Sequence, residues 1–205
     1  MEGDKGMATR GEGSSYQASV VTMSEPLPTE ADFLLNDGGP VPQEAWKNFG
    51  GLSLEQAYEK FCDRAYLYSQ DFEFMGERAF AYYYEVLDRY VRETIETLDE
   101  ERLMVLSTVH RIIDVHLIHR SGYLCGEYSG EGAVDAMGLP GRVVSLCDCV
   151  MPAIAERSLS SRIPDSDATD EDLTISWQGL RNLAESMKPS EPPSPHPQSS
   201  PHLPS

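Results

Sequence analysis

A histidine and an aspartate four residues apart are the first side chains in this sequence that could do chemistry. His110 and Asp114 would share one face of a helix, where a carboxylate can orient an imidazole that acts as a base. Such a pair needs a nucleophile, and no serine or cysteine stands in a recognisable nucleophile motif. Two interpretations follow: a helical enzyme that uses His110 and Asp114, or a pair that stabilises its helix, which is the simpler one.

Three histidines of the same segment raise the question of a metal site. At about 100° per residue, His110 and His119 project in opposite directions, so only His116 and His119 share a face. A zinc site needs three or four convergent ligands, and two histidines do not supply them. We therefore predict no metal ion and place these histidines at the polar edges of a buried helix.

Two further motifs for redox or cofactor chemistry are incomplete. Cys147 and Cys149 stand about 200° apart around a helix, so their thiols are badly placed for a redox pair. The glycines of segment 121–141 follow no strand and precede no Gly-Lys-Ser or Gly-Lys-Thr sequence, which a phosphate-binding loop would require. The sequence therefore predicts no cofactor and no catalytic centre, and we expect a protein that is not an enzyme.

Charge narrows the range of partners. The 205 residues include 34 acidic and 16 basic side chains, and the formal net charge is −18. Contacts with phosphates or anionic lipids need Lys or Arg, so direct binding to nucleic acid or to a membrane surface is disfavoured. A protein partner is the expectation that remains, and the sequence leaves the oligomeric state open.

Hydropathy and cysteine content bear on the compartment. No apolar run approaches the roughly 20 residues that span a bilayer, and residues 1–10 lack the apolar core of a secretory signal. The four irregularly spaced cysteines favour reduced thiols over a disulfide framework. We expect a protein without a transmembrane anchor in the cytoplasm, with the nucleus as the alternative.

Composition divides the chain into one domain and two tails. Residues 1–50 are rich in Gly, Ser, Glu and Pro, and seven prolines follow Lys188. Segments of this kind bury too little apolar surface to offset the entropy lost on ordering. We predict a disordered acidic, glycine-rich tail over 1–50, a helical domain over 51–187 and a disordered proline-rich tail over 188–205.

Apolar residues at three-to-four spacing predict the elements of that domain. The pattern indicates helices over 52–69, 77–98, 99–119, 142–158 and 173–187. Pro152 is expected to kink or break the fourth helix. The third is apolar over more than half of its circumference, which is typical of a buried central helix. No alternating strand pattern is present, so the sequence predicts a single all-α helical bundle.

Short linear motifs support a different hypothesis, a scaffold that acts mainly through its tails. Ser194 and Ser200 each precede a proline and fit proline-directed phosphorylation, and Glu30–Leu35 fits an acidic dileucine pattern or an acidic–hydrophobic interaction segment. Residues 123–127 are similar to the Leu-x-Cys-x-Glu motif that docks on retinoblastoma-type pocket proteins, with Tyr123 in place of the leucine. On this hypothesis, deletion of a tail would abolish activity.

Four segments carry a resemblance to a known family. They are an amphipathic helix over 84–91, an apolar helix from Val105 to Asp114, the sequence Leu-Pro-Gly-Arg-Val-Val over 139–144, and residues 170–177. In this order they resemble the first helix, the death-motif helix, the start of the central helix and the entry to the late helix of viral B-cell-lymphoma-type (Bcl-like) proteins, especially those of poxviruses. The resemblance covers about residues 77–187. It differs at Ile113, where the family has a small residue, and in the polar tail, where many members have a membrane anchor.

The resemblance implies a helical bundle that inhibits host apoptosis or innate NF-kappa-B signalling. Its partner would be a host signalling or pro-apoptotic protein, bound as an amphipathic helix in a hydrophobic groove or on an exposed helical face. The glycine before Arg142 would let a partner helix approach closely, and the arginine would pair with an aspartate of the partner. The partner-binding residues implied are Tyr84, Val109, Ile113, Gly141, Arg142 and Val143. Each of them also fits an ordinary core position, so both interpretations stay open at this point.

Overall fold

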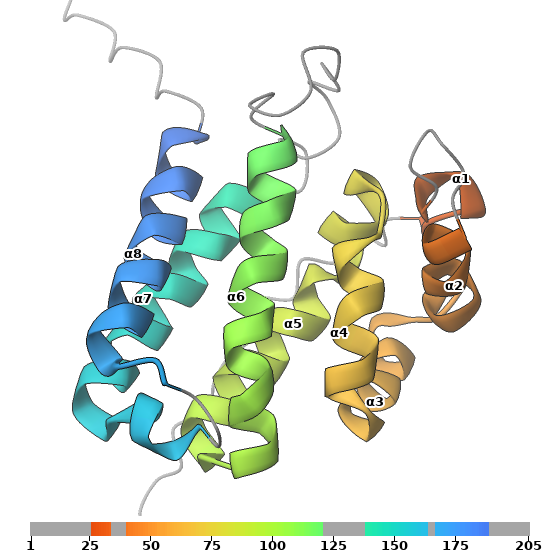
Figure 1. The fold of residues 1–205 in the computed structure, drawn as a ribbon. Coiled ribbons are helices and arrows are strands. Elements are labelled where there is room, and N and C mark those ends of the chain that lie inside the picture. The colour runs from red at the N-terminus through yellow and green to blue at the C-terminus, as the bar shows by residue number, and fades with distance from the viewer. Residues whose placement is uncertain (1–25, 34–39, 121–137, 164–166, 189–205) are drawn as a thin grey trace, which may run out of the picture.

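The protein is a bundle of helices (Figure 1). The computed structural model describes residues 26–33, 40–120, 138–163 and 167–188, and it has no strand among them. In chain order the elements are α1 (Glu30–Phe33), α2 (Pro40–Phe49), α3 (Leu54–Asp63), α4 (Ala65–Glu73), α5 (Glu77–Thr97), α6 (Glu100–Arg120), α7 (Leu139–Arg157), the 3₁₀ helix η1 (Leu159–Arg162) and α8 (Asp170–Ser186). The predicted all-α class is confirmed. The motifs at Tyr123, Ser194 and Ser200 lie outside the described residues.

The two longest helices, α5 and α6, lie in the middle of the bundle. In Figure 1, α7 and α8 stand on one side of α6, and α1 to α4 stand on the other. The turn between the two helices uses Leu98 in the left-handed region (φ 56°), and the Asp99 carboxylate accepts a hydrogen bond from the backbone N–H of Arg102 at 3.0 Å. These helices match the predicted ranges 77–98 and 99–119, and α6 is buried along its apolar stripe as expected.

Helices α7 and α8 pack along each other and close one side of the bundle. A capping box starts α8: the Thr169 hydroxyl accepts from the Asp172 N–H at 3.1 Å, and the Asp172 carboxylate accepts from the Thr169 N–H at 2.9 Å. Pro152 does not end α7, which continues to Arg157. Because Pro152 is on the exposed face, water can reach the carbonyl that has lost its N–H partner.

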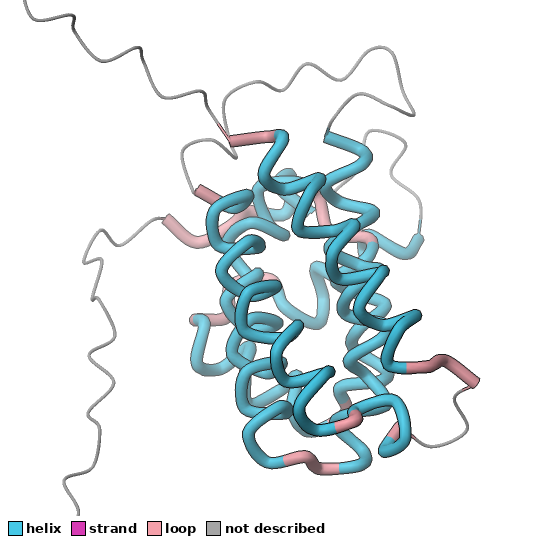
Figure 2. Tube along the Cα trace, turned by 90° about the vertical axis from the view of Figure 1, so that its left-hand side faces the viewer, coloured by secondary structure: helices cyan, strands magenta, loops and turns pink. Residues whose placement is uncertain are grey.

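The segment predicted as one helix over 52–69 is two helices. α3 and α4 meet at Arg64, whose backbone is not helical (φ −148°, ψ 58°). The change of direction brings Phe61 of α3 and Phe72 of α4 together in the core, with an edge-to-face contact and ring centroids 5.2 Å apart. Figure 2 shows the helices of the bundle from a second direction, with the loops of the described residues between them.

The helical domain begins before residue 51, which corrects the predicted boundary. Helices α1 and α2 fall inside the range 1–50 that composition assigned to a tail. Phe33, Ala45 and Phe49 from these helices are fully buried and belong to the main core. Aromatic burial therefore orders a segment whose overall composition is typical of disorder.

Replacement of Tyr83 by Phe tests how the N-terminal helices are held. The Tyr83 hydroxyl is within 2.7 Å of the Phe49 carbonyl and 2.9 Å of the Leu52 carbonyl, where it ties α5 to the end of α2. We expect Tyr83→Phe to lower the free energy of unfolding by about 1 kcal/mol, because both carbonyls lose the Tyr83 donor while the Phe49 carbonyl keeps its hydrogen bond from the Leu52 N–H. Urea denaturation measures the change. Tyr66→Phe is the control, since the Tyr66 side chain is exposed and its variant should change stability by less than about 0.5 kcal/mol.

Candidate partner-binding site

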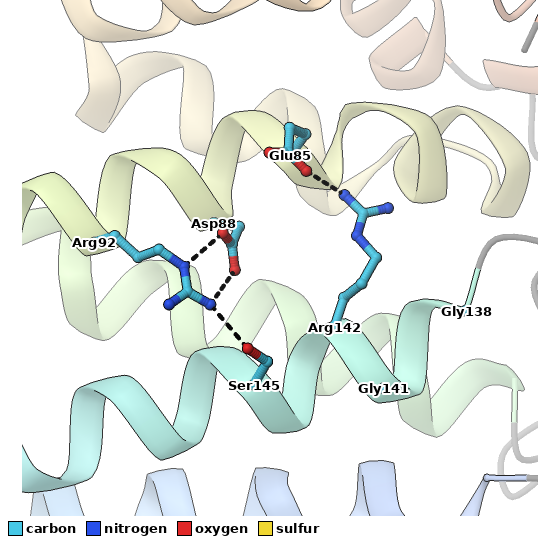
Figure 3. Close-up of a pocket in the computed structure, with 7 residues that line it drawn as sticks. All are labelled: Glu85, Asp88, Arg92, Gly138, Gly141, Arg142 and Ser145. Carbon is cyan, nitrogen blue, oxygen red and sulfur yellow. Dashed lines mark hydrogen bonds and ion pairs between the residues drawn. The ribbon is translucent and has the colours of Figure 1, made fainter. Parts of the chain in front are cut away.

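A pocket lined mainly by charged residues lies between α5 and α7 and contains two of the predicted partner-binding residues (Figure 3). Its volume is about 400 Å³. Gly141 and Arg142 from the first turn of α7 line it on one side, and α5 supplies the opposite side. The complete lining is Glu85, Asp88, Arg92, Gly138, Gly141, Arg142 and Ser145.

Arg142 spans the space between the two helices. Its guanidinium donates to the Glu85 carboxylate at 2.9 Å and to the backbone carbonyl of Ala81 at 3.3 Å. The same group lies over the Tyr84 ring, 4.8 Å from its centroid, in a cation–π contact. About 30% of the Arg142 side chain and 54% of the Glu85 side chain stay exposed, so water and a partner can reach this ion pair.

A second ion pair lies further along α5. The Arg92 guanidinium donates to both carboxylate oxygens of Asp88, at 2.8 and 3.2 Å, and reaches the Ser145 hydroxyl on α7 at 3.3 Å. Hydrogen bonding to Asp88 holds the pKa of Arg92 above its ordinary value, so the guanidinium stays charged. This pair is less exposed than the Arg142–Glu85 pair, and it lines another part of the same pocket.

Two glycines keep the α7 side of the pocket open. A Cβ atom added to Gly138 or Gly141 would meet no atom within 4 Å. Gly138 also has a φ of 60°, a conformation that other residues adopt only at a cost, and it begins α7. Gly141 is exposed on the helix surface, where the absence of a side chain allows another chain to approach the α7 backbone closely.

The other predicted binding residues do not line this pocket. Tyr84 lies directly beneath Arg142, is fully buried, and its hydroxyl has no hydrogen-bond partner within the described residues. Val109, Ile113 and Val143 are fully buried core residues. The structure thus places Gly141 and Arg142 together at the pocket and puts the remaining four in the interior.

His110 lies away from the pocket, against α8. Its ring centroid is 5.7 Å from that of Trp177, and it forms a hydrogen bond with the backbone of Ser176. Burial lowers the pKa of His110, which the charge of Asp114 opposes in part. The pair has the surroundings of a helix-packing contact, and neither residue belongs to the pocket.

The other histidines and cysteines considered for metal or redox chemistry each have their own surroundings. His116 is buried, stacks on Phe80 with ring centroids 3.6 Å apart, and its Nε2 lies 2.8 Å from the Phe72 carbonyl oxygen. The His119 side chain lies outside the described part of the chain. Across the described residues, no group of three or more His, Cys, Asp and Glu side chains is placed to hold a metal ion. Cys147 is buried, which raises the pKa of its thiol to about 12, whereas Cys149 is partly exposed.

The lowered pKa of His110 predicts a pH dependence of stability. A histidine whose folded-state pKa lies below its ordinary value of 6.5 is protonated more readily in the unfolded chain, so stability falls as pH drops below about 6.5. We expect wild type to lose more stability between pH 7.5 and 5.5 than His110→Gln, as measured by urea unfolding at both values. Equal losses of stability in the two proteins would contradict this prediction, because protonation of His110 would then not disturb the packing of α6 on α8.

Sequence reasoning missed the α5 side of the pocket. Glu85, Asp88 and Arg92 recur at three- and four-residue spacing, which is the signal of one polar helical face. Charged positions of a helix usually form a solvent-exposed face, and nothing in the spacing shows that α7 lies opposite. Ser145 carries no signal of its own in the sequence.

Comparison of the chain with protein-family models, with curated proteins and with solved structures gave no match. Among the described helices, none combines the length and the apolar character needed to cross a membrane. The inference of function therefore depends on the geometry of the site and on the resemblance in the sequence.

Proposed function

We propose that this protein is a non-enzymatic interaction protein that binds a partner protein on the face between α5 and α7, with Arg142 at its centre. The observation that carries the proposal is the state of Arg142. Its guanidinium is fixed over the Tyr84 ring at an open pocket, and its ion-pair partner Glu85 is more than half exposed. An arginine placed in this way is ready to exchange one carboxylate for another.

The partner's contact with Arg142 is an acidic side chain. Exposed ion pairs of this kind contribute only about 0–1 kcal/mol, so Glu85 is displaced at little cost. A carboxylate that accepts from Arg142 in a contact that excludes water gains a stronger, charge-assisted hydrogen bond. The fixed Asp88–Arg92 pair next to it limits where a second charge of the partner is tolerated, which gives selectivity.

The shape of the face suits a helix. Gly138 and Gly141 leave two positions at the start of α7 without side chains, so a partner backbone can lie close to the helix there. An amphipathic helix with one acidic residue fits both the open surface at the two glycines and the charge of Arg142. This is the mode of binding that the resemblance to viral Bcl-like proteins implies. On this proposal the partner is a host signalling or pro-apoptotic protein, and binding takes place in the cytoplasm.

A steric block on α7 tests the proposal. Gly141→Phe fills the open surface next to Arg142 without removing a charge, and we expect it to reduce partner capture from human cell lysate at least about tenfold, since a helix can no longer approach. Quantitative mass spectrometry of proteins captured by wild type and variant provides the measurement.

Gly179→Phe is the matched control. Gly179 is also an exposed helical glycine, on α8, with open space around it. The two substitutions change helix propensity and surface hydrophobicity in the same way, so partners lost only in Gly141→Phe identify the α5–α7 face. Capture profiles that are the same for both variants and wild type would rule out this face as the binding site.

A further inference from the structure

A short acidic segment packs against aromatic side chains of α2 and α5, at the opposite end of α5 from Arg92. The segment is residues 28–33, which includes α1, and it contacts α2 and α5 (Figure 1). Phe33 at its end is completely buried, with ring centroids 5.3 Å from Trp46 and 5.9 Å from Tyr83. Side chains of α2 and α5 therefore form the receiving surface for one phenyl ring.

The aspartate before Phe33 is bound as specifically as the ring. The Asp32 carboxylate accepts from Arg78 at 3.0 and 3.1 Å, and from the Thr29 backbone and hydroxyl at 2.7 and 2.8 Å. Burial works to raise the pKa of Asp32, but the hydrogen bonds from Thr29 and Arg78 outweigh it and lower this pKa. Thr29 belongs to the segment itself, so Arg78 is the contribution of α5 to the charged state of this carboxylate.

The backbone of the segment is recognised too. The Gly76 N–H donates to the Phe33 carbonyl at 3.2 Å, immediately before α5 begins. A Cβ atom at position 76 would lie 2.3 Å from the Asp32 carbonyl oxygen, a distance that no real contact adopts. Glycine is therefore required for the segment to lie against the start of α5.

We propose that the surface formed by Trp46, Gly76, Arg78 and Tyr83, called the groove from here on, is a peptide-recognition site for an acidic–aromatic segment in which aspartate precedes phenylalanine. The chain's own residues 28–33 fill it, and a segment of the same chemistry from a partner protein replaces them. The groove supplies a cation for the carboxylate, aromatic contacts for the ring and a backbone donor for the carbonyl. Together these three contacts recognise a peptide segment and not a single side chain.

The bound segment has the properties of a ligand. A helix of four residues is too short to be stable by itself, so α1 is ordered by the groove. Segments held by few buried side chains open locally more often than core helices do, and an open groove can accept a competitor. This site is independent of the α5–α7 face: Tyr83 belongs to the groove, whereas its neighbour Tyr84 packs under Arg142.

Peptide binding to the full chain tests the proposal. The probe is a labelled peptide with the sequence of residues 26–33, Pro-Leu-Pro-Thr-Glu-Ala-Asp-Phe. Wild type keeps its own segment at a high effective concentration, so we expect Phe33→Ala, which vacates the groove, to bind the probe at least about tenfold more tightly. Nuclear magnetic resonance titration measures binding up to about 2 mM peptide, the weak range expected for a short segment that normally binds intramolecularly.

A charge exchange separates recognition from misfolding. Arg78→Asp in the Phe33→Ala chain should lose the native probe and should bind a probe in which the aspartate is replaced by arginine. Failure of the native probe to bind a Phe33→Ala chain with wild-type circular dichroism overturns the proposal, as does equal binding of both probes to the Arg78→Asp chain. A wild-type dimer in light scattering that Phe33→Ala abolishes would also overturn it, because the occupant would then be a second copy of this chain.

Discussion

Replacement of Arg142 by glutamate is expected to weaken partner binding at least about tenfold while the protein stays folded. The variant removes the guanidinium that a partner's carboxylate needs and places a negative charge beside Glu85, so both the attraction and the local charge are reversed. Loss of the exposed Arg142–Glu85 pair itself costs the fold little. Isothermal titration calorimetry with a partner captured by wild type measures the affinity. Circular dichroism checks that the variant and wild type are equally helical.

Arg181→Glu is the control for this variant. Arg181 also joins two helices, with its guanidinium 2.7 Å from the Asp148 carboxylate on α7, and 25% of its side chain is exposed against 30% for Arg142. The two substitutions therefore change net charge and one interhelical ion pair equally. Partner binding that falls by the same factor in both variants would contradict a specific role for Arg142.

Replacement of Trp177 by alanine is expected to have the largest effect on stability. Trp177 is fully buried and anchors α8 against the core, where it packs near His110 of α6. Truncation of a buried tryptophan leaves a cavity and typically lowers the free energy of unfolding by about 3–5 kcal/mol. Urea denaturation followed by circular dichroism measures this change.

A phenylalanine at the same position separates packing from hydrogen bonding. The Trp177 indole nitrogen makes no hydrogen bond within the described residues, so Trp177→Phe loses volume but no partner. We expect it to cost clearly less than Trp177→Ala, because much of the buried ring surface remains. Equal losses in the two variants would show that the indole nitrogen has a partner that matters more than the packing.

The sequence was sufficient to predict the long helices of the core. In α5 and α6 the apolar residues repeat at helical spacing over 21 residues each, and a strand would not bring residues at this spacing to one face. The buried nature of α6 followed from its apolar circumference. These features depend on local periodicity, which a single sequence contains in full.

The N-terminal helices could not be predicted in the same way. The range 1–50 has the Gly, Pro and acidic content of a disordered tail, and α2 begins at Pro40, which is favourable at a helix start but also common in loops. Phe33 and Phe49 order this region by contact with residues far along the chain, including Tyr83. Tertiary contacts of this kind leave no periodic signal in so short a segment.

The candidate site was predictable only in part. Gly141 and Arg142 were identified from a short motif, and the structure places them side by side at a pocket. Val109 and Ile113 were assigned to a groove, but an apolar stripe shows only that a helix face is covered, and in the structure the covering is the core itself. Which helix lies opposite a polar face, as α7 lies opposite Glu85, depends on tertiary packing.

Site-specific photo-crosslinking most directly tests the claim that the α5–α7 face binds a partner. A benzophenone amino acid at Ser145, at the exposed edge of the pocket, is compared in human cell lysate with the same group at Ile175, an exposed position on α8. We predict a discrete crosslinked protein from position 145, absent from position 175 and reduced by Arg142→Glu. A crosslink that forms only from position 175, or one from position 145 that Arg142→Glu leaves unchanged, would contradict the proposed binding face.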